Sequence, residues 1–115
     1  LQDSDIISLH LPATTQTEKI INETNIKLMK KDSIIINTAR GKLIDEKALI
    51  KALENKEIGG AALDVYRVEP LKDVALSQCK GKLILTPHIG AQTKETQVDA
   101  AIKIALKMSS FLKNL

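Results

Sequence analysis

Residues 33–38 read Ser-Ile-Ile-Ile-Asn-Thr, and three consecutive isoleucines are typical of a strand that is covered on both faces. Strands of that kind belong to parallel sheets, which carry helices on each side. Three further short apolar runs read in the same way: DIISLHL at 5–11, GAALDVY at 60–66 and KLILT at 82–86. We therefore predict a parallel sheet built from four strands.

Helical patterns separate these runs. Asn22 can cap a helix that continues through Lys30, with Ile21 and Ile26 placed as a hydrophobic staple around its first turn. Asp45 can cap a second helix, which we expect to end at the glycine pair 59–60. The apolar face of that helix consists of Ala48, Leu49, Ala52 and Leu53. Alternating strands and helices predict an α/β fold with right-handed crossovers.

The longest predicted helix runs from Thr93 to Asn114 and has two apolar stripes. The first consists of Val98, Ala101, Ile102, Ala105, Ser109 and Leu112, and the second of Ile104, Met108, Phe111 and Leu115. A surface helix of a single domain needs only one apolar face. We therefore expect this helix to be covered from two sides, by its own sheet and by a second domain or a partner.

Composition indicates one folded domain, since the chain has 115 residues of which 43% are hydrophobic and 27% charged. Every apolar run ends well before the roughly 18 residues that a membrane span requires. The N-terminus also lacks the pattern of a secretion signal. Cys79 is the single cysteine, so no internal disulfide forms and a reducing compartment is expected. These features predict a cytoplasmic protein without a membrane partner.

Charge and motif content exclude several kinds of site. The net charge of +3 is spread along the chain, and only Tyr66 and Phe111 offer aromatic rings for stacking, so nucleic-acid binding is not expected. His10, Cys79 and His88 lack the spacing of a zinc site, so no metal is expected. The five glycines form neither a G-x-G-x-x-G pattern nor a Walker loop.

Reactive side chains follow the predicted strands, where ligands of open parallel sheets bind. Arg40 follows the second strand, and its planar guanidinium suits a carboxylate or phosphate; the alternative is that it neutralises a nearby acid. His88 follows the fourth strand and suits proton transfer near neutral pH, although a lone loop histidine is often structural. These two residues are the first candidates for chemistry.

Two carboxylates belong to the third strand and its exit. Glu69 alone would be interpreted as a surface residue, but it can orient His88 if the second and fourth strand exits are neighbours and the third is close. Asp64 interrupts an apolar run and would be costly to bury without partners. We expect Asp64 to accept hydrogen bonds from the backbone or from a ligand amide.

Four ordered motifs resemble a known family: HLPATTQTEKII at 10–21, IINTARGKLIDEKALIKAL at 35–53, GGAALDVYRVEP at 59–70 and LTPHIGAQT at 85–93. They are similar to the second half of the nucleotide-binding domain of the D-isomer-specific 2-hydroxyacid dehydrogenases. Within this family, HIGAQTKETQ and NTARG most resemble the D-3-phosphoglycerate dehydrogenases. The resemblance implies the second half of a Rossmann-like parallel sheet with flanking helices and a long C-terminal helix.

The resemblance also implies roles for particular residues. Arg40 would bind the substrate carboxylate and polarise the carbonyl, His88 would be the general acid and base, and Glu69 would pair with His88. Asp64 would hold the nicotinamide carboxamide. The implied NAD-binding set is Leu11, Pro12, Thr17, Thr38, Ala39, Arg40, Asp64, His88 and Gly90.

The family pattern is incomplete in this chain, which begins without an initiator methionine. Residues 1–91 would form the C-terminal half of an NAD-binding domain, and residues 92–115 a helix returning toward a substrate domain that is not present. We expect this fragment to bind cofactor weakly or not at all and to be inactive alone. Its open sheet edge predicts self-association or pairing with the missing half, and the resemblance implies a homodimer or a larger homo-oligomer.

Three functions remain open at this stage. The first is hydride transfer between NAD, or NADP, and a small D-2-hydroxy acid, with 3-phosphoglycerate and serine biosynthesis expected. The second is a glyoxylate/hydroxypyruvate reductase or a D-lactate-type dehydrogenase. The third is a non-catalytic module that resembles a corepressor or mediates assembly.

Overall fold

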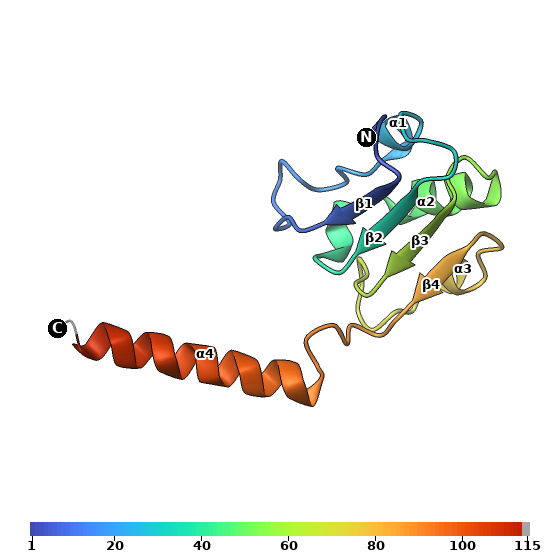
Figure 1. Ribbon diagram of the computed structural model, residues 1–115. Coiled ribbons are helices and arrows are strands. Elements are labelled where there is room, and N and C mark those ends of the chain that lie inside the picture. The colour runs from blue at the N-terminus through green and yellow to red at the C-terminus, as the bar shows by residue number, and fades with distance from the viewer. Residues whose placement is uncertain (114–115) are drawn as a thin grey trace.

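The computed structural model describes residues 1–113, and in that range the strands form one parallel sheet (Figure 1). Its strands are β1 (Ile6–Leu9), β2 (Ile34–Asn37), β3 (Gly60–Leu63) and β4 (Leu83–Leu85), in the spatial order β1-β2-β3-β4. The predicted α/β fold with four parallel strands is confirmed. Because β3 lies between β2 and β4, the second and fourth strand exits are not neighbours, and the exit of β3 separates them.

The two faces of the sheet differ in what covers them. In the register of the strands, Ile7, Ile35, Ala61 and Leu83 are aligned partners and point to one face. That face packs against α1, α2 and α3, whose apolar side chains join the same core. The opposite face carries Ile6, Ile34 and Ile84, which are all exposed. The expectation that the strand at 33–38 is covered on both faces is therefore wrong for the described residues.

Helix α1 (Glu23–Ile26) begins where expected and ends early. The side-chain oxygen of Asn22 accepts hydrogen bonds from the backbone N–H groups of Thr24 and Asn25, each at 3.0 Å. Both residues of the expected staple, Ile21 and Ile26, are buried. The helix stops after one turn instead of continuing through Lys30, because a tighter turn, in which Met29 N–H bonds to Ile26 O at 2.9 Å, replaces the helical pattern.

Helix α2 (Glu46–Glu54) is capped by Asp45, which accepts from Ala48 N–H at 3.3 Å. Leu49, Ala52 and Leu53 of the expected apolar face are buried. The helix ends at Glu54 with Asn55 as its C-cap, and Lys56 takes a left-handed conformation with φ of 56°, so the glycine pair at 59–60 does not end it. The 3-10 helix η1 (Gly41–Leu43) and the short helix α3 (Val74–Ser77) were not predicted.

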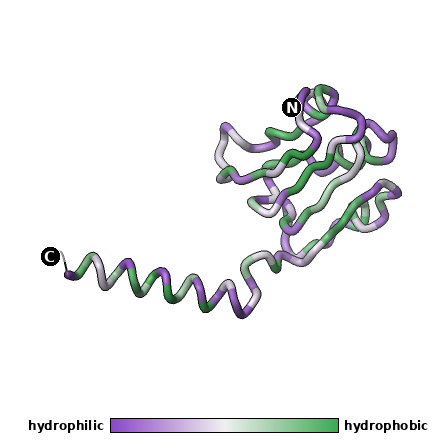
Figure 2. Tube along the Cα trace, viewed as in Figure 1, coloured by the Kyte–Doolittle hydropathy of each residue, from purple (hydrophilic) through white to green (hydrophobic). Residues whose placement is uncertain are grey.

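The long helix α4 (Lys94–Lys113) extends away from the sheet, and none of its residues is buried (Figure 1). Apolar and polar residues alternate along the described helix (Figure 2), and the described residues of both expected stripes are exposed. The prediction that its own sheet covers this helix is wrong, because β4 and α4 are joined by a segment that directs the helix outward. The expected end at Asn114 and the stripe residue Leu115 lie outside the described residues.

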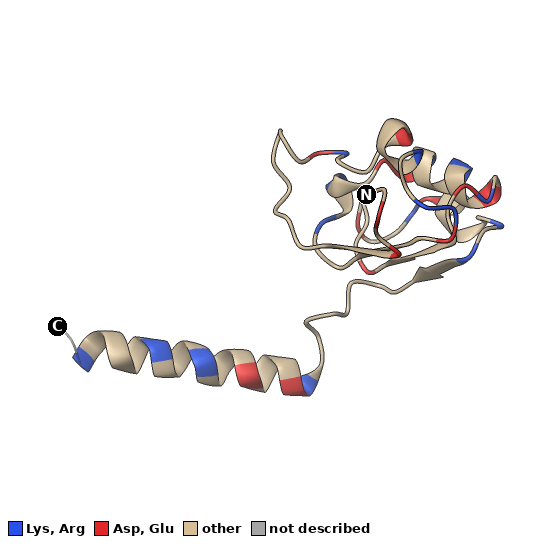
Figure 3. Cartoon of the chain, turned by 45° about the horizontal axis from the view of Figure 1, so that its top comes forward, with Lys and Arg blue, Asp and Glu red and all other residues tan. Residues whose placement is uncertain are grey.

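Charges along α4 follow the direction of the helix. Its acidic residues, Glu95 and Asp99, lie in the first half, and three of its four lysines follow them toward the C-terminal end (Figure 3). This distribution stabilises the helix, because the N-terminus of a helix favours negative charge and the C-terminus positive charge. Within residues 1–113, no helix is long and apolar enough to cross a membrane.

Because helices cover one face of the sheet and leave the other open, substitutions at two adjacent residues of β2 should differ in their effect on stability. Ile35 is 0% exposed and Ile34 is 40% exposed. We expect Ile35→Ala to lower the free energy of unfolding by about 3 kcal/mol, because it leaves a cavity in the core. Ile34→Ala on the open face should cost about 1 kcal/mol or less. Urea denaturation of the two variants measures the difference, and equal losses would show that both faces are covered.

Candidate active site

The end of β2 holds Arg40 through a buried amide. The side-chain oxygen of Asn37 accepts a hydrogen bond from Ala39 N–H at 3.1 Å, and its nitrogen donates to Arg40 O at 3.0 Å. A buried asparagine that satisfies both backbone groups fixes the path of the loop. The guanidinium of Arg40 is exposed, and its Nη1 donates to Ala39 O at 2.6 Å. The loop therefore holds the backbone of Arg40 in place and exposes its guanidinium at the carboxyl ends of the strands.

Gly41 brings this loop against the exit of β3. A Cβ at position 41 would collide with the backbone carbonyl of Tyr66 and with the N–H of Arg67, so only glycine fits without movement. Arg67 N–H in turn donates to the carboxylate of Glu46 at the start of α2, at 2.7 Å. The close backbone approach places Arg40 beside the loop that carries Glu69.

Asp64 ties the end of β3 to the segment after β4. It is only 6% exposed, and its Oδ1 accepts from Thr86 Oγ1 at 2.6 Å and from Ile89 N–H at 2.9 Å. Its Oδ2 accepts from Gly90 N–H at 2.8 Å. Burial acts to raise the pKa of Asp64, but these three hydrogen bonds outweigh it and leave the pKa below its ordinary value. We expected Asp64 to accept hydrogen bonds from the backbone or from a ligand amide, and the structure shows the backbone donors Ile89 N–H and Gly90 N–H.

His88 and Glu69 form a short hydrogen bond between the exits of β4 and β3. Nδ1 of His88 lies 2.6 Å from Oε2 of Glu69. The hydrogen bond with His88 lowers the pKa of Glu69, and one from Tyr66 N–H adds to this effect. An ionised carboxylate only accepts hydrogen bonds, so Nδ1 must carry the proton. The second ring nitrogen, Nε2, is then the one that can exchange a proton with a substrate.

The backbone of His88 has a φ of 56°, which is a left-handed conformation. This conformation costs a residue with a side chain about 1–2 kcal/mol. Such residues are found where the surrounding structure holds them, and they gather at functional sites. The neighbouring anchor is Asp64, which binds Thr86, Ile89 and Gly90 on both sides of the histidine.

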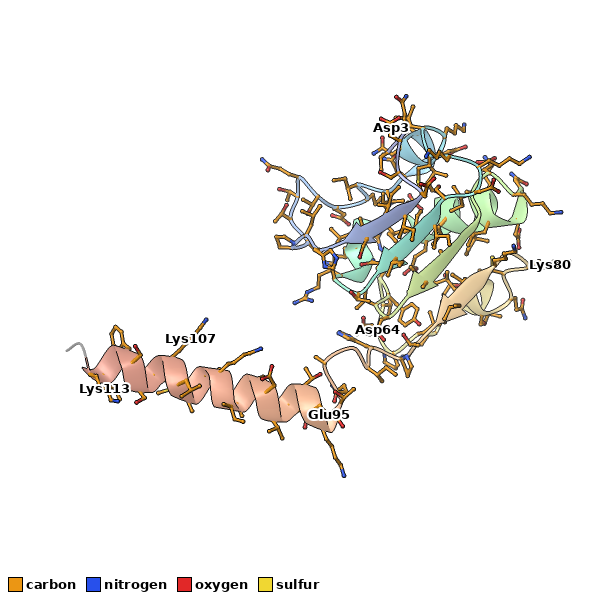
Figure 4. The ribbon with its side chains drawn as sticks, viewed as in Figure 1. Asp3, Asp64, Lys80, Glu95, Lys107 and Lys113 are labelled. Carbon is orange, nitrogen blue, oxygen red and sulfur yellow. The ribbon has the colours of Figure 1, made fainter. Side chains whose placement is uncertain are left out.

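Arg40, Glu69 and His88 line one cleft of about 410 Å³. The remaining lining residues are Ala13, Gly41, Lys42, Val65, Tyr66 and Arg67. A guanidinium, a carboxylate and an imidazole that are far apart in the sequence are therefore brought together. The cleft lies beyond the carboxyl ends of the strands, at the end of the sheet where Figure 4 labels Asp64. A cation beside a proton-exchanging imidazole can bind an acid and move a proton on it.

The other predicted site residues do not line this cleft. Leu11, Pro12 and Thr17 follow β1, where the hydroxyl of Thr17 donates to Pro12 O at 2.6 Å. Thr38 and Ala39 precede Arg40, and Gly90 is bound to Asp64. All of these residues follow the carboxyl end of a strand.

Sequence reasoning did not select Ala13, Lys42 and Tyr66 as parts of the site, although all three line the cleft. The available signal was Asn37, a polar residue at the end of an apolar strand, because a buried amide there must bind the backbone of the following loop. In residues 1–113, no group of three or more His, Cys, Asp and Glu side chains is arranged to hold a metal ion.

Residues 1–90 match the family model described as D-isomer specific 2-hydroxyacid dehydrogenase, NAD binding domain. The chain belongs to this family, and the likeness expected from its four motifs is confirmed. It is 44% identical to the D-3-phosphoglycerate dehydrogenase of Synechocystis over 113 residues, which are 98% of this chain and 20% of that protein. It is also 44% identical to the glyoxylate reductase of Thermococcus litoralis, covering 98% of this chain and 34% of that protein.

Solved structures of a reductase and of a dehydrogenase share this fold. An acyclic imino acid reductase in complex with NADPH and D-Arg superposes with a TM-score of 0.83 at 36% identity, covering 98% of this chain and 36% of that one. The D-lactate dehydrogenase of Lactobacillus jensenii with NAD⁺ gives a TM-score of 0.77 at 37% identity, covering 99% and 38%. The chain spans about a fifth to a third of the length of the curated relatives.

The His88–Glu69 hydrogen bond predicts a shift in titration. His88→Ala should raise the pKa of Glu69 toward its ordinary value of 4.5, because the strongest lowering contact is lost. While the contact exists, the ionised carboxylate adds stability above its ordinary pKa, and this contribution is lost as the pH falls through the lowered value. Carboxyl ¹³C NMR measures the shift.

Glu23 is the internal control for this titration. Its pKa is lowered by Lys51 and Lys27 and should not respond to the substitution at position 88. A pKa of Glu69 that stays the same in His88→Ala would mean that the hydrogen bond does not form in solution.

Proposed function

We propose that this chain is part of an NAD-dependent oxidoreductase that transfers a hydride between a nicotinamide cofactor and a small D-2-hydroxy acid. The observation that carries the proposal is the cleft that Arg40, Glu69 and His88 share, with its 2.6 Å hydrogen bond between imidazole and carboxylate. An acid substrate needs a cation for its carboxylate, and its hydroxyl needs a proton acceptor nearby. Both groups are present, and family membership supports this use of them.

In the proposed mechanism Arg40 binds the substrate carboxylate as a bidentate partner and polarises the carbonyl of the 2-oxo acid. In the oxidation direction, Nε2 of neutral His88 accepts the proton of the 2-hydroxyl group. In reduction, the imidazolium returns that proton to the carbonyl oxygen. Glu69 keeps the proton on Nδ1 and orients the ring, so that Nε2 is the nitrogen that exchanges the proton with the substrate. When bound, the nicotinamide supplies the hydride chemistry.

The donor and acceptor groups around Asp64 fit a nicotinamide. Oδ2 of Asp64 accepts one hydrogen bond in the structure and has capacity for a second, such as an amide N–H of the carboxamide. The backbone of Thr38, Ala39 and Gly90 would line the ring, and the loop with Leu11, Pro12 and Thr17 would contact the adenosine half. The glycines of this chain form no phosphate-binding loop. We therefore propose that residues 1–115 alone bind cofactor weakly and do not turn over substrate.

For the substrate we propose D-3-phosphoglycerate, and with it a role in serine biosynthesis in the cytoplasm. The support is the identity of 44% to the D-3-phosphoglycerate dehydrogenases of Synechocystis and Bacillus subtilis. The glyoxylate reductase of Thermococcus litoralis shows the same identity, which favours glyoxylate or hydroxypyruvate as the second candidate. Both NAD and NADP occur with solved relatives, and we propose NAD because the matched family model describes an NAD-binding domain.

A non-catalytic assembly role is the candidate from a different class. Its support is the apolar surface of α4 and of the open sheet face, which is exposed in the described residues. The same surface is compatible with a homodimeric enzyme. Loss of hydride transfer on substitution of His88 distinguishes the two candidates, because a binding module does not need an acid or base at this position.

A chimera tests the proposed activity. Residues 1–115 replace the matching segment of Bacillus subtilis D-3-phosphoglycerate dehydrogenase, to which they are 44% identical along their whole length. The chimera should reduce NAD with D-3-phosphoglycerate, and His88→Ala should lower kcat by a factor of about 10²–10⁴. Arg40→Lys should lower kcat/KM by about tenfold or more, because a point charge replaces the bidentate fork.

Lys80→Ala is the matched control for the loss of a cation, since Lys80 lies at the opposite end of the sheet from Asp64 (Figure 4). This variant should keep the activity of the chimera. Full turnover in a folded His88→Ala chimera would contradict the proposed function.

The substrate is tested on the product of the reading frame that encodes residues 1–115. With NAD, we expect kcat/KM for D-3-phosphoglycerate to exceed that for glycolate and D-lactate by about tenfold or more, because a second anionic group adds binding energy. A higher kcat/KM for glycolate would instead support the reductase. Absence of hydride transfer with all three acids, together with self-association, would support the assembly module.

A further inference from the structure

Tyr66 is a buried residue that lines the cleft and has no part in the proposed mechanism. It follows β3, is 6% exposed, and is the single tyrosine of the sequence. Its hydroxyl donates to Thr86 O at 2.6 Å, and Leu63 O lies 3.2 Å from the same oxygen. Burial raises the pKa of Tyr66, so the phenol keeps the proton that it donates. The ring thus connects the end of β3 to the segment that carries His88.

The acceptor of this hydrogen bond also belongs to the turn of His88. Thr86 O accepts the backbone N–H of His88 at 3.0 Å, so the phenol and the histidine N–H share one carbonyl oxygen. His88 is the residue in this turn with the left-handed φ of 56°. Because the buried hydroxyl of Tyr66 holds Thr86 O in place, the turn whose hydrogen bond ends on that oxygen has little freedom to move. The hydroxyl of Tyr66 therefore holds the backbone from which the imidazole projects.

The backbone of the same residue holds the partner of the histidine. Tyr66 N–H donates to Oε1 of Glu69 at 3.1 Å, while Oε2 of Glu69 binds Nδ1 of His88 at 2.6 Å. The two oxygens of the carboxylate are thus divided between Tyr66 and His88. One residue reaches both members of the pair, by its hydroxyl on one side and by its N–H on the other.

We propose that Tyr66 is the positioning residue of the His88–Glu69 pair. Its hydroxyl fixes the turn of His88 through Thr86 O, and its backbone N–H orients the carboxylate of Glu69. The proposal concerns geometry, and only its kinetic consequence rests on the proposed function. Tyr66→Phe removes the first contact and retains the ring and the N–H, so it tests the hydroxyl alone.

The first experiment uses the 115-residue chain and does not depend on turnover. ¹H–¹⁵N NMR follows the rate at which the Nδ1 proton of His88 exchanges with water. His10, the other histidine of the sequence, is the internal reference. In Tyr66→Phe this exchange should become about five- to tenfold faster, which corresponds to the loss of about one hydrogen bond. The exchange at His10 should not change.

Ser33→Ala is the matched control. Ser33 is a buried residue at the other end of the sheet, and its hydroxyl also donates to a backbone carbonyl, Lys30 O at 2.7 Å. Both variants lose a buried hydroxyl and should lower the thermal midpoint, but only Tyr66→Phe should speed exchange at His88. Equal exchange at His88 in the two variants would overturn the proposal and leave Tyr66 a merely structural role.

A second measurement retains the hydroxyl and keeps the test decisive if Tyr66→Phe does not fold. Because the chain has one tyrosine, growth on 3-fluorotyrosine changes the acidity of this phenol alone. A more acidic phenol donates a stronger hydrogen bond to Thr86 O, so the Nδ1 proton of His88 should exchange more slowly. Unchanged exchange in the fluorinated chain would count against the proposal.

The kinetic consequence is measured in the chimera described above. Tyr66→Phe should lower kcat, because a loosened turn holds the imidazole of His88 less precisely against the substrate. Ser33→Ala should leave kcat unchanged. A wild-type chimera without turnover would refute the proposed function, while the exchange experiments would still decide the role of Tyr66.

Discussion

The buried carboxylate of Asp64 is the contact on which the geometry of the cleft depends. It stands at the end of β3 and receives donors from Thr86, Ile89 and Gly90, all of which follow β4. A buried carboxylate without partners would be strongly unfavourable, so these three hydrogen bonds are required once Asp64 is inside. Together the three hydrogen bonds fix the segment from Thr86 to Gly90, which contains His88. The chemistry of the cleft is thus fixed by a residue that lines none of it.

The three side chains of the cleft lie on loops, while their supports are backbone groups and strand ends. Arg40 is set by the amide of Asn37 and by the close packing of Gly41 on the backbone at Tyr66. A parallel sheet brings such loops to one edge because all its strands end there. In α/β proteins the functional side chains usually lie on loops, and the sheet and helices hold those loops in place; this chain follows the same pattern.

Much of this arrangement could be predicted from local patterns. The triple isoleucine at 34–36 predicted β2, and the caps at Asn22 and Asp45 predicted two helix starts, because these signals lie within a few residues. The rule for ligand sites at strand ends placed Arg40 and His88 on one edge. Helix ends, η1 and α3 could not be predicted, because they depend on distant contacts such as the one between Gly41 and the Tyr66 backbone. The two stripes of α4 predicted a cover from its own sheet and from a second domain or partner; the part about the sheet is wrong, because the pattern on a helix shows that it has an apolar face and does not specify the neighbour.

The open face of the sheet and the exposed α4 also have a thermodynamic consequence. The heat capacity change on unfolding grows with the apolar surface that unfolding newly exposes, at about 12–15 cal/mol/K per residue in ordinary domains. Here a large part of that surface is already hydrated in the native chain. We therefore expect a smaller heat capacity change per residue than in a domain whose sheet is covered on both faces, and with it a flatter curve of stability against temperature.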